Sequence, residues 1–265
     1  MVKIVINGAA GRMGKHLVAL AIQDPELTIV GAFERPDHPS LGKDAGLVAG
    51  AGELGVELTT RRPVEADAAV DFSSRESSLE MLRWCPEQGI PLVVGTTGLG
   101  EEGAALLEAA AKRIPCLMGP NMSLGVNLLF NLVAQVASAL GEDYDVEIIE
   151  AHHRHKRDAP SGTALRLGQR VAEALGLSLE EVAAHGRHGL VGERPKAQIG
   201  FHAVRAGDIV GEHTVVFGGM GERVELRHVA SSRETFARGA LRAAKFLVGK
   251  PPGTYSMADV LGLEP

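Results

Sequence analysis

Short aliphatic runs alternate with helical patterns over the first 120 residues. Runs that are short and uniformly apolar predict buried strands at 3–7, 27–33, 68–72, 92–95 and 116–118. Apolar residues at helical spacing predict helices over 13–22 and around 75–85 and 101–112. Apolar strands that alternate with helices are typical of a parallel sheet covered on both faces. This part of the chain is therefore predicted to have an α/β fold.

The pattern changes after Asn121. Helices are predicted over 124–140, 163–175 and 234–247, and strands at 146–151, 197–205, 214–217 and 224–229. Gly207-Asp208 and residues 218–221 are typical of hairpin turns, and the Gly-rich polar segment 184–195 predicts a mobile loop. The second region is therefore predicted to be α+β, with an open mixed sheet.

One face of this second sheet is expected to be too apolar for water. Four apolar residues alternate with polar partners along its strands, namely Val215, Phe217, Val224 and Leu226. Helices or another subunit must cover such a face. A homo-oligomer is predicted on this ground.

A glycine-rich segment lies between the first strand and the first helix. Residues 8–14 read Gly-Ala-Ala-Gly-Arg-Met-Gly, a G-x-x-G-x-x-G spacing. Glycines in this context permit a tight turn and bring backbone N–H groups and a helix N-terminus to a pyrophosphate. The pattern favours a dinucleotide site, and a glycine-rich turn without a ligand is the alternative.

The second strand ends at Phe33-Glu34-Arg35, about 20 residues beyond Gly14. A carboxylate there can accept a hydrogen bond from the adenosine ribose 2′-OH of NAD, whereas Arg35 or Arg12 can bind the 2′-phosphate of NADP. The adjacent Glu and Arg suggest that both cofactors are used. A solvated carboxylate at the strand end is the alternative interpretation of Glu34.

Two further strand exits carry residues suited to ligand binding. Residues 94–98 and 119–123 follow predicted parallel strands, at whose carboxyl ends open α/β sheets bind ligands. Ordinary turns are the alternative. His213 and His228, in strand-like stretches, are interpreted as structural, and solvation is expected for His185 and His188 in the predicted loop.

The most distinctive segment is Glu150 to Thr163, in which residues 152–157 are all basic or titratable. A helix start follows at Ser161-Gly162-Thr163, where Ser161 or Thr163 can cap the helix. A positive loop beside a helix N-terminus forms an anion site, and a small carboxylate substrate suits it. A solvated loop is one alternative, and a zinc site formed by the histidines of this run is another.

The basic run also contains residues suited to proton transfer. Its basic neighbours disfavour the ammonium form of Lys156, so this residue can both pair with a carboxylate and donate a proton. His152 or His153 can act as an acid near neutral pH or donate a hydrogen bond to developing negative charge.

Composition narrows the class of protein. The 265 residues are 45% apolar and 23% charged, which is typical of a globular protein. The net charge of −6 gives no reason to expect nucleic-acid binding. No basic-then-apolar signal segment and no membrane span is predicted, and Cys85 and Cys116 are interpreted as free thiols in a reducing compartment.

These motifs resemble those of the 4-hydroxy-tetrahydrodipicolinate reductase family, also called the dihydrodipicolinate reductases. The resemblance runs nearly from end to end and includes residues 8–14, Gly-Thr-Thr-Gly at 95–98, Pro120-Asn121, and 205–213. Its most specific part is Glu-Ala-His-His-Arg-His-Lys at 150–156 followed by Asp-Ala-Pro-Ser-Gly-Thr-Ala at 158–164. Where the family often has Ala-Pro-Asn-Phe, this chain has Gly-Pro-Asn-Met at 119–122.

The resemblance implies a Rossmann-type dinucleotide-binding domain over 1–123, completed by 233–265. It implies a substrate-binding and oligomerisation domain over 124–232 that builds a homotetramer. It further implies a cytoplasmic enzyme of lysine and diaminopimelate biosynthesis. That enzyme uses NADPH or NADH to reduce a small cyclic imine dicarboxylate, 4-hydroxy-tetrahydrodipicolinate or its dehydrated form.

Specific roles follow from the same resemblance. His152 is implied as proton donor or acceptor and Lys156 as proton donor, with no metal, and substrate contacts are implied for His153, Gly162 and Thr163. The implied cofactor-binding residues are Gly8, Ala9, Ala10, Gly11, Arg12, Met13, Glu34, Arg35, Gly95, Thr96, Thr97, Gly119, Pro120, Asn121 and Met122.

Overall fold

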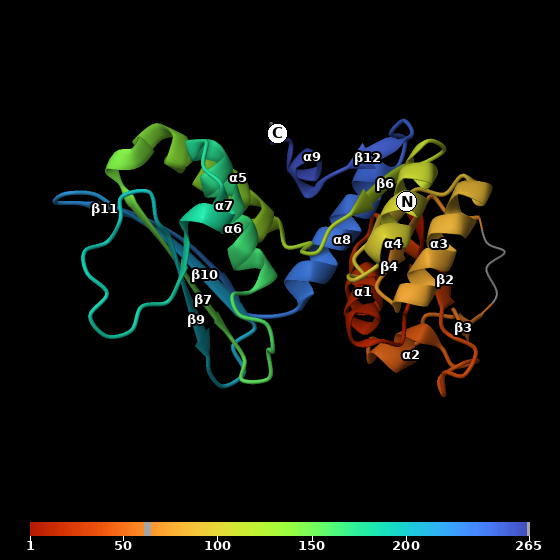
Figure 1. The fold of residues 1–265 in the computed structure, drawn as a ribbon. Helices are drawn as coiled ribbons and strands as arrows, with labels where there is room; N and C mark the ends of the chain where they lie inside the picture. The colour runs from red at the N-terminus through yellow and green to blue at the C-terminus, as the bar shows by residue number, and fades with distance from the viewer. Residues whose placement is uncertain (61–64, 264–265) are drawn as a thin grey trace. The chain divides into compact units, whose positions relative to one another are not determined.

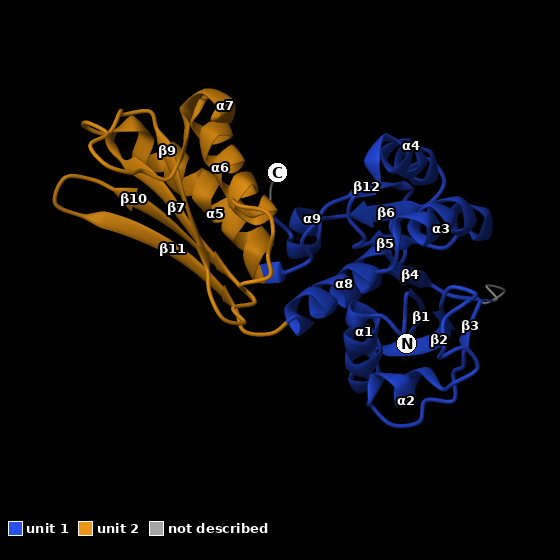
Figure 2. Cartoon of the chain, turned by 60° about the horizontal axis from the view of Figure 1, so that its bottom comes forward, with its two compact units in different colours: residues 1–124, 233–264 blue, residues 125–232, 265 orange. Residues whose placement is uncertain are grey.

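A computed structural model of the chain describes residues 1–60 and 65–263, so the end of the predicted 233–265 segment lies outside the described residues. These residues form two compact units (Figure 1, Figure 2). Unit 1 consists of residues 1–124 and the described part of 233–264, and unit 2 consists of residues 125–232.

Unit 1 contains a seven-stranded sheet in the order β12-β6-β5-β4-β1-β2-β3, in which all neighbouring strands are parallel. The α/β fold predicted for this part of the chain is confirmed. Its strands are β1 (Val2–Asn7), β2 (Leu27–Phe33), β3 (Leu58–Thr59), β4 (Ala68–Asp71), β5 (Leu92–Val94), β6 (Pro115–Met118) and β12 (Gly253–Tyr255).

Helices cover both faces of this sheet, which explains its uniformly apolar strands. Ile4 and Ile6 of β1 belong to the core beneath α1 and α8, whereas Val5 belongs to the opposite core beneath α3 and α4. The helices of unit 1 are α1 (Arg12–Gln23), α2 (Ala45–Ala49), α3 (Arg75–Gln88), α4 (Gly100–Ala111), α8 (Glu234–Leu247) and α9 (Met257–Leu261).

The sheet of unit 1 ends on a strand that sequence patterns did not predict. β12 pairs in parallel with β6, with Thr254 opposite Cys116. Its three residues, Gly-Thr-Tyr, are too short and too polar to form a recognisable apolar run. The returning C-terminal segment thus supplies a sheet edge as well as the predicted helix over 234–247.

Unit 2 contains a mixed sheet in the order β11-β10-β7-β9-β8, as predicted for the second region. β7 pairs in parallel with β9 and antiparallel with β10. β9 and β10 therefore lie on opposite sides of β7, and the chain that joins them crosses over β7. The prediction of a hairpin at Gly207-Asp208 is wrong. Its strands are β7 (Asp145–His152), β8 (Ala183–His185), β9 (Ile199–Arg205), β10 (Gly211–Gly218) and β11 (Arg223–Ala230).

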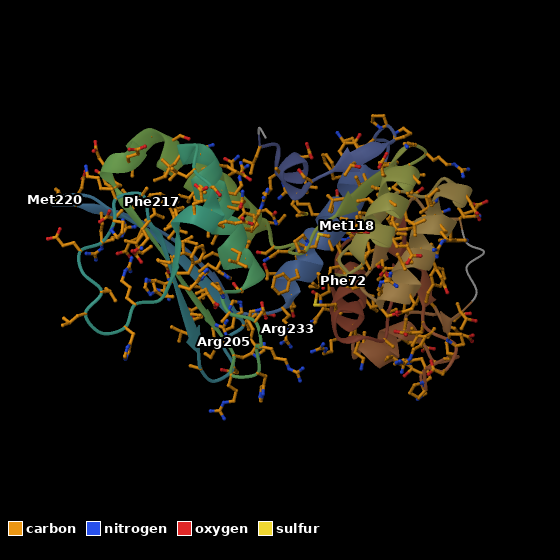
Figure 3. The ribbon with its side chains drawn as sticks, in the orientation of Figure 1. Phe72, Met118, Arg205, Phe217, Met220 and Arg233 are labelled. Carbon is orange, nitrogen blue, oxygen red and sulfur yellow. The ribbon has the colours of Figure 1, made fainter. Side chains whose placement is uncertain are left out.

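The predicted hairpin at 218–221 does join β10 to β11, with Met220 at its tip (Figure 3). The helices of unit 2 lie on one face of the sheet (Figure 1). They are α5 (Leu124–Leu140), α6 (Gly162–Leu175) and α7 (Leu179–Val182), with the 3₁₀ turn η1 (Gly141–Asp143) after α5.

Helices cover the face of the mixed sheet that the sequence predicted to be too apolar for water. Val215 and Phe217 are buried in the core beneath α5 and α6, and Leu226 packs against that core. Of the two covers that the sequence allowed for this face, helices or another subunit, the structure shows the helices. Glu212, Thr214 and Val216, which alternate with Val215 and Phe217 along β10, lie on the other face.

The predicted mobile loop over 184–195 is wrong at its start, because Ala183–His185 is strand β8. The rest of the segment is irregular but tied to the sheet. The guanidinium of Arg187 donates to both carboxylate oxygens of Glu147, at 3.0 and 2.8 Å. Arg194 donates to Glu147 at 2.9 Å and to Asp145 at 2.6 Å.

The apolar segment Leu124–Asp143 is long enough and apolar enough, by composition, to cross a membrane. Three of its residues, Leu129, Val133 and Ala137, are instead buried in the core of unit 2. The segment is thus a packing helix for the mixed sheet.

Candidate active site

A cavity of about 640 Å³ opens at the carboxyl ends of the strands of unit 1. Nine residues predicted to bind the cofactor line it: Gly8, Gly11, Arg12, Met13, Glu34, Arg35, Gly95, Thr96 and Thr97. The remaining lining residues have no role predicted from the sequence; they are Asn7, His38, Phe72, Ser73, Ser74, Arg75 and Ser77. The position matches the rule that open α/β sheets bind ligands at their carboxyl edge.

The glycine loop has the close packing that a pyrophosphate cradle requires. Gly8 has φ +77°, and a Cβ there would lie 2.3 Å from the carbonyl oxygen of Phe72. A Cβ on Gly14 would lie 2.0 Å from the carbonyl oxygen of Gly8. Side chains at these positions would push the loop from the sheet. The loop therefore leads its backbone N–H groups and the N-terminus of α1 to the cavity.

Glu34 is held by the glycine loop itself. The Ala10 N–H donates to Glu34 Oε1 at 2.9 Å, which fixes the carboxylate at the end of β2. Arg35, on the cavity wall, pairs with Asp37 at 3.1 Å and remains largely exposed. Ala9 and Ala10 are buried, so these two predicted contacts can be made only through their backbone.

A buried carboxylate organises the floor of the cavity. Asp71, at the end of β4, is inaccessible to water and accepts hydrogen bonds from Asn7 Nδ2 at 2.6 Å and Thr96 Oγ1 at 2.9 Å. Ser73 Oγ donates to it at 2.5 Å, and Ser78 Oγ also donates. Burial raises the pKa of Asp71, and these hydrogen bonds oppose that rise. Asn7 and Asp71 could be recognised in the sequence as the polar residues that end two apolar strands.

The segment 119–122 has a different environment from the one expected. The Met122 side chain is buried in the core of unit 1, and a Cβ on Gly239 of α8 would lie 1.7 Å from the Met122 carbonyl oxygen. Within the described residues, the cavity wall does not include this segment. The cofactor contacts of Gly119, Pro120, Asn121 and Met122 stay a prediction, and the Met122 side chain serves packing.

In unit 2 the basic run follows the end of β7 and leads into α6. Ser161 caps this helix, because its hydroxyl accepts from the Ala164 N–H at 3.1 Å. Of the two caps that the sequence allowed, the structure uses Ser161. Gly162 and Thr163 therefore form the first turn of α6, where the positive end of the helix dipole favours an anion.

A buried carboxylate that sequence analysis left without a role joins the parts of this site. Glu150 Oε2 lies 2.6 Å from His152 Nδ1, and its Oε1 accepts from the Ser161 N–H at 3.0 Å. Arg205, at the end of β9 (Figure 3), donates to the two oxygens at 2.6 and 2.7 Å. A third bond runs from Arg205 to the Asp158 carbonyl at 2.7 Å.

The sequence did contain a signal for Glu150. Val146, Ile148 and Glu150 occupy alternate positions of β7, and the first two are buried in the core. A carboxylate on the inward face of an apolar alternation needs partners inside the fold.

The electrostatics of the network keep Glu150 ionised and His152 neutral. Burial raises the pKa of Glu150, but hydrogen bonds from Arg205 and His152 outweigh it and lower that pKa. Burial is also the main cause of the lowered pKa of His152, and the cations Lys156 and Arg205 add to it. His152 is therefore an uncharged imidazole near neutral pH.

Lys156 is partly exposed and pairs with Asp158, whose two oxygens both lie 2.9 Å from its Nζ. An anion thus accompanies the lysine, in addition to the cationic neighbours that the sequence showed. His153 is half-buried, with its ring centroid 6.2 Å from that of His155. The predicted substrate residues accordingly lie along one short stretch, from the end of β7 to the start of α6.

The other histidines differ in their surroundings. His213 is buried, with Nε2 3.1 Å from Ser161 Oγ and its ring 5.2 Å from the His152 ring. Burial lowers its pKa to about 3, so it is a neutral part of the site's support. His185 is exposed, as expected, and its ring also stacks on Phe201 at 5.4 Å. No group of three potential metal ligands occurs among residues 1–60 and 65–263.

Comparison with known proteins covers both units. A family model described as dihydrodipicolinate reductase, N-terminus, matches residues 2–122, and one described as dihydrodipicolinate reductase, C-terminus, matches residues 125–261. A 4-hydroxy-tetrahydrodipicolinate reductase of Anaeromyxobacter dehalogenans is 53% identical over 266 residues, or 99% of this chain and 98% of the relative. One of Hahella chejuensis is 52% identical and covers 100% of both chains.

A solved structure shares the fold at lower identity. The dihydrodipicolinate reductase of Paenisporosarcina sp. TG-14, described as dipicolinate bound, has a TM-score of 0.76 and 23% identity, with 98% of each chain covered. The two family models and the full-length relatives confirm the resemblance found in the sequence motifs. The chain therefore belongs to the dihydrodipicolinate reductase family of NAD(P)H-dependent oxidoreductases, which act in lysine and diaminopimelate biosynthesis.

Proposed function

We propose that this chain reduces 4-hydroxy-tetrahydrodipicolinate, or its dehydrated form, to tetrahydrodipicolinate with NADPH or NADH. The observation that carries the proposal is the junction of β7 and α6. There a neutral His152 held by Glu150, the ammonium of Lys156 and the first turn of α6 occur within one stretch of chain. Positive charge and a helix N-terminus suit the binding of a dicarboxylate, and its reduction also requires a proton source.

The cavity of unit 1 is suited to the cofactor. Without a Cβ at Gly8 and Gly14, the loop packs closely against its neighbours, and α1 directs its N-terminus toward the cavity. Glu34 is available to a ribose 2′-OH, and Arg35 to a 2′-phosphate. The nicotinamide cofactor, when bound, supplies a hydride to the substrate.

The residues of unit 2 would bind the substrate and manage its proton. The first turn of α6, with Gly162 and Thr163, binds one carboxylate, and His153 donates a hydrogen bond to the substrate. Lys156 gives a proton to the ring after reduction, because its side chain is partly exposed and can reach a bound ligand. His152 shares in the proton transfer, directly or through water.

The direct test is NADPH or NADH oxidation after adding the coupled product of aspartate semialdehyde and pyruvate. We expect oxidation of NADPH or NADH that requires both the enzyme and this coupled product, which serves as its substrate. Pyridine-2,6-dicarboxylate should compete with the substrate because it presents two similarly placed carboxylates, and the Paenisporosarcina relative is described as binding dipicolinate. Absence of product-dependent oxidation with both nucleotides would contradict the proposal.

We also propose that the enzyme works as a homotetramer in the cytoplasm. The mixed sheet of unit 2 has helices on one face only, and the other face carries the exposed apolar residues Ile149, Val204 and Val229. The cytoplasmic placement follows from the biosynthetic relatives, whose pathway consumes small soluble metabolites and nicotinamide cofactors.

A further inference from the structure

We propose that Glu150 is a positioning residue for the reduction: it holds the His152 ring with its proton on Nδ1, so that Nε2 remains a hydrogen-bond acceptor. The proposal rests on the proposed function, because Glu150 acts on the reaction only through His152. Under this proposal, His152 accepts a hydrogen bond at Nε2 and Lys156 donates the proton.

The geometry leaves Glu150 little freedom. The residue is only 1% exposed, and its two oxygens receive the four contacts from His152, Ser161 and both terminal nitrogens of Arg205. A carboxylate offers about four lone-pair sites, so its accepting capacity is filled. Each partner comes from a different part of the site: the end of β7, the cap of α6 and the end of β9.

The charge of Glu150 determines which nitrogen of His152 carries the proton. The bidentate pair with Arg205 keeps Glu150 ionised despite its burial. An ionised carboxylate only accepts hydrogen bonds, and the 2.6 Å contact to Nδ1 therefore requires hydrogen on Nδ1. In the neutral imidazole, the other nitrogen, Nε2, then has a lone pair.

The groups that face His152 favour its neutral form. They are Glu150 on the same strand, Arg205 from β9, His213 from β10, and Lys156 from the loop after β7. Only Glu150 supports a positive ring. Burial and the cations Lys156 and Arg205 oppose it, and His213 is itself neutral. His152 thus reaches the reaction as an acceptor at Nε2.

A purely structural role for Glu150 is the competing explanation, because it also ties the Ser161 N–H and Arg205 together. Glu150→Gln separates the two roles. The amide keeps the shape but loses the charge, and it can turn its NH₂ toward Nδ1, which favours hydrogen on Nε2. A positioning role requires that this change act through His152, whereas a structural role does not.

The kinetic test is a double-mutant cycle of Glu150→Gln and His152→Ala. We expect Glu150→Gln to lower kcat by about 10²-fold, within the range of general acid–base catalysis, with KM changed less than about threefold. In the His152→Ala background it should lower kcat no further. Glu147→Gln is the matched control, because Glu147 also lies on β7 and is held by Arg and His side chains.

The spectroscopic test reads the His152 tautomer in the wild-type holoenzyme, so its main result does not depend on whether Glu150→Gln folds. In ¹⁵N-histidine spectra near pH 7.5, with the His152 signal assigned from His152→Ala, we expect Nδ1 protonated and Nε2 unprotonated. Glu147→Gln should leave this signal unchanged, and Glu150→Gln should shift it. A wild-type ring protonated only on Nε2 would overturn the proposal.

The remaining outcomes separate the proposal from the proposed function. If His152→Ala keeps wild-type kcat, the role of His152 fails, and this proposal fails with it. If His152→Ala is impaired but Glu150→Gln is not, the proposed function stands and the positioning role is refuted. Equal losses from Glu150→Gln with and without His152 would show a structural role and also refute it.

Discussion

At the scale of single residues, three carboxylates removed largely from water organise this chain, and their neighbours determine their charge. Asp71 meets neutral hydroxyl and amide donors, and burial raises its pKa. Glu150 and Glu147 meet arginines, so that the pKa of each is lowered although burial acts against this. The first carboxylate shapes the cofactor cavity, the second the substrate loop, and the third a surface segment.

The basic run yields a prediction about single side chains. Lys156→Ala and His152→Ala should each lower kcat by about 10²–10⁴-fold, the usual range for general acid–base catalysis. His153→Ala and Thr163→Ala should mainly raise KM, because they act on substrate charge in both the ground and transition states. The measurement is steady-state kinetics on the four variants, with circular dichroism as the check on folding. Near-wild-type kcat in both of the first two variants would make the loop a docking surface only.

The end of β2 yields a prediction about cofactor choice. Arg35→Ala should raise KM for NADPH more than for NADH, because a charge-assisted contact to the 2′-phosphate contributes roughly 1.5–3 kcal/mol. The exposed Asp37, its partner at 3.1 Å, does not hold Arg35 away from a ligand, since such pairs are weak. Arg238→Ala on α8 is the control. Equal effects of Arg35→Ala on both cofactors would contradict the assignment.

Some site residues were readable from sequence and others were not. The glycine-loop residues that line the cavity were predicted from the sequence because spacing along the chain specifies them. Glu150 with Arg205, and Asn7 with Asp71, are 55 and 64 positions apart and meet only through strand pairing. Pairing of distant strands is a tertiary event, so periodicity within one segment could not show these contacts.

At the scale of elements, the segment after β8 shows how ion pairs order an irregular region. Glu147 accepts from Arg187 and Arg194, which lie within this segment, and from His202 of β9, which follows it. Burial raises the pKa of Glu147, yet these donors outweigh it and lower the pKa to about 2. The segment is therefore tied to β7 by the charge of one residue.

The stability of this element should depend on pH in a defined direction. The pKa of Glu147 is lower in the folded protein than its ordinary value of 4.5, so its contribution is full above pH 4.5 and is lost as pH falls toward 2. The shift corresponds to roughly 3 kcal/mol. Glu147→Gln should therefore lower the unfolding free energy at pH 7 and flatten its decline below pH 4.5, as measured by urea unfolding.

A control on the same sheet makes this prediction specific. Glu225 pairs with Arg223 at the surface, and exposed pairs contribute about 0–1 kcal/mol. Glu225→Gln should therefore leave the pH dependence of unfolding as in the wild type. An equal response of the two variants would show that Glu147 contributes no more than a surface pair.

Regular elements were predicted well where hydrophobic periodicity determines them. β2 and α8 occupy the ranges predicted for them, because each buries a continuous apolar face. β12 and the chain over β7 were missed because strand order, not local pattern, determines them. The apolar face of the mixed sheet was predicted from alternation, but alternation did not indicate whether helices or another subunit cover that face.

At the scale of the whole molecule, the open face of the mixed sheet remains the basis for a tetramer. Exposed apolar side chains on that face include Ile149, Val204 and Val229, and β11 is an edge strand. A second copy of the sheet would cover both the face and the edge, because the same surface of each copy can pack against the other. Val215, Phe217 and Leu226, from which oligomerisation was predicted, lie in the core beneath the helices, so the tetramer rests on the exposed residues of the other face instead.

The oligomeric state tests this argument directly. We expect sedimentation at micromolar concentration to give a species four times the 27.9 kDa chain. Ile149→Glu should shift the protein toward smaller species. Another subunit would cover this face in the tetramer, so the introduced charge would be buried without a partner. Leu47→Glu on α2, another exposed apolar residue but in unit 1, should leave the assembly intact. A wild-type protein that sediments only as the 27.9 kDa chain would refute the tetramer, and equal effects of the two variants would remove the sheet face as its cause.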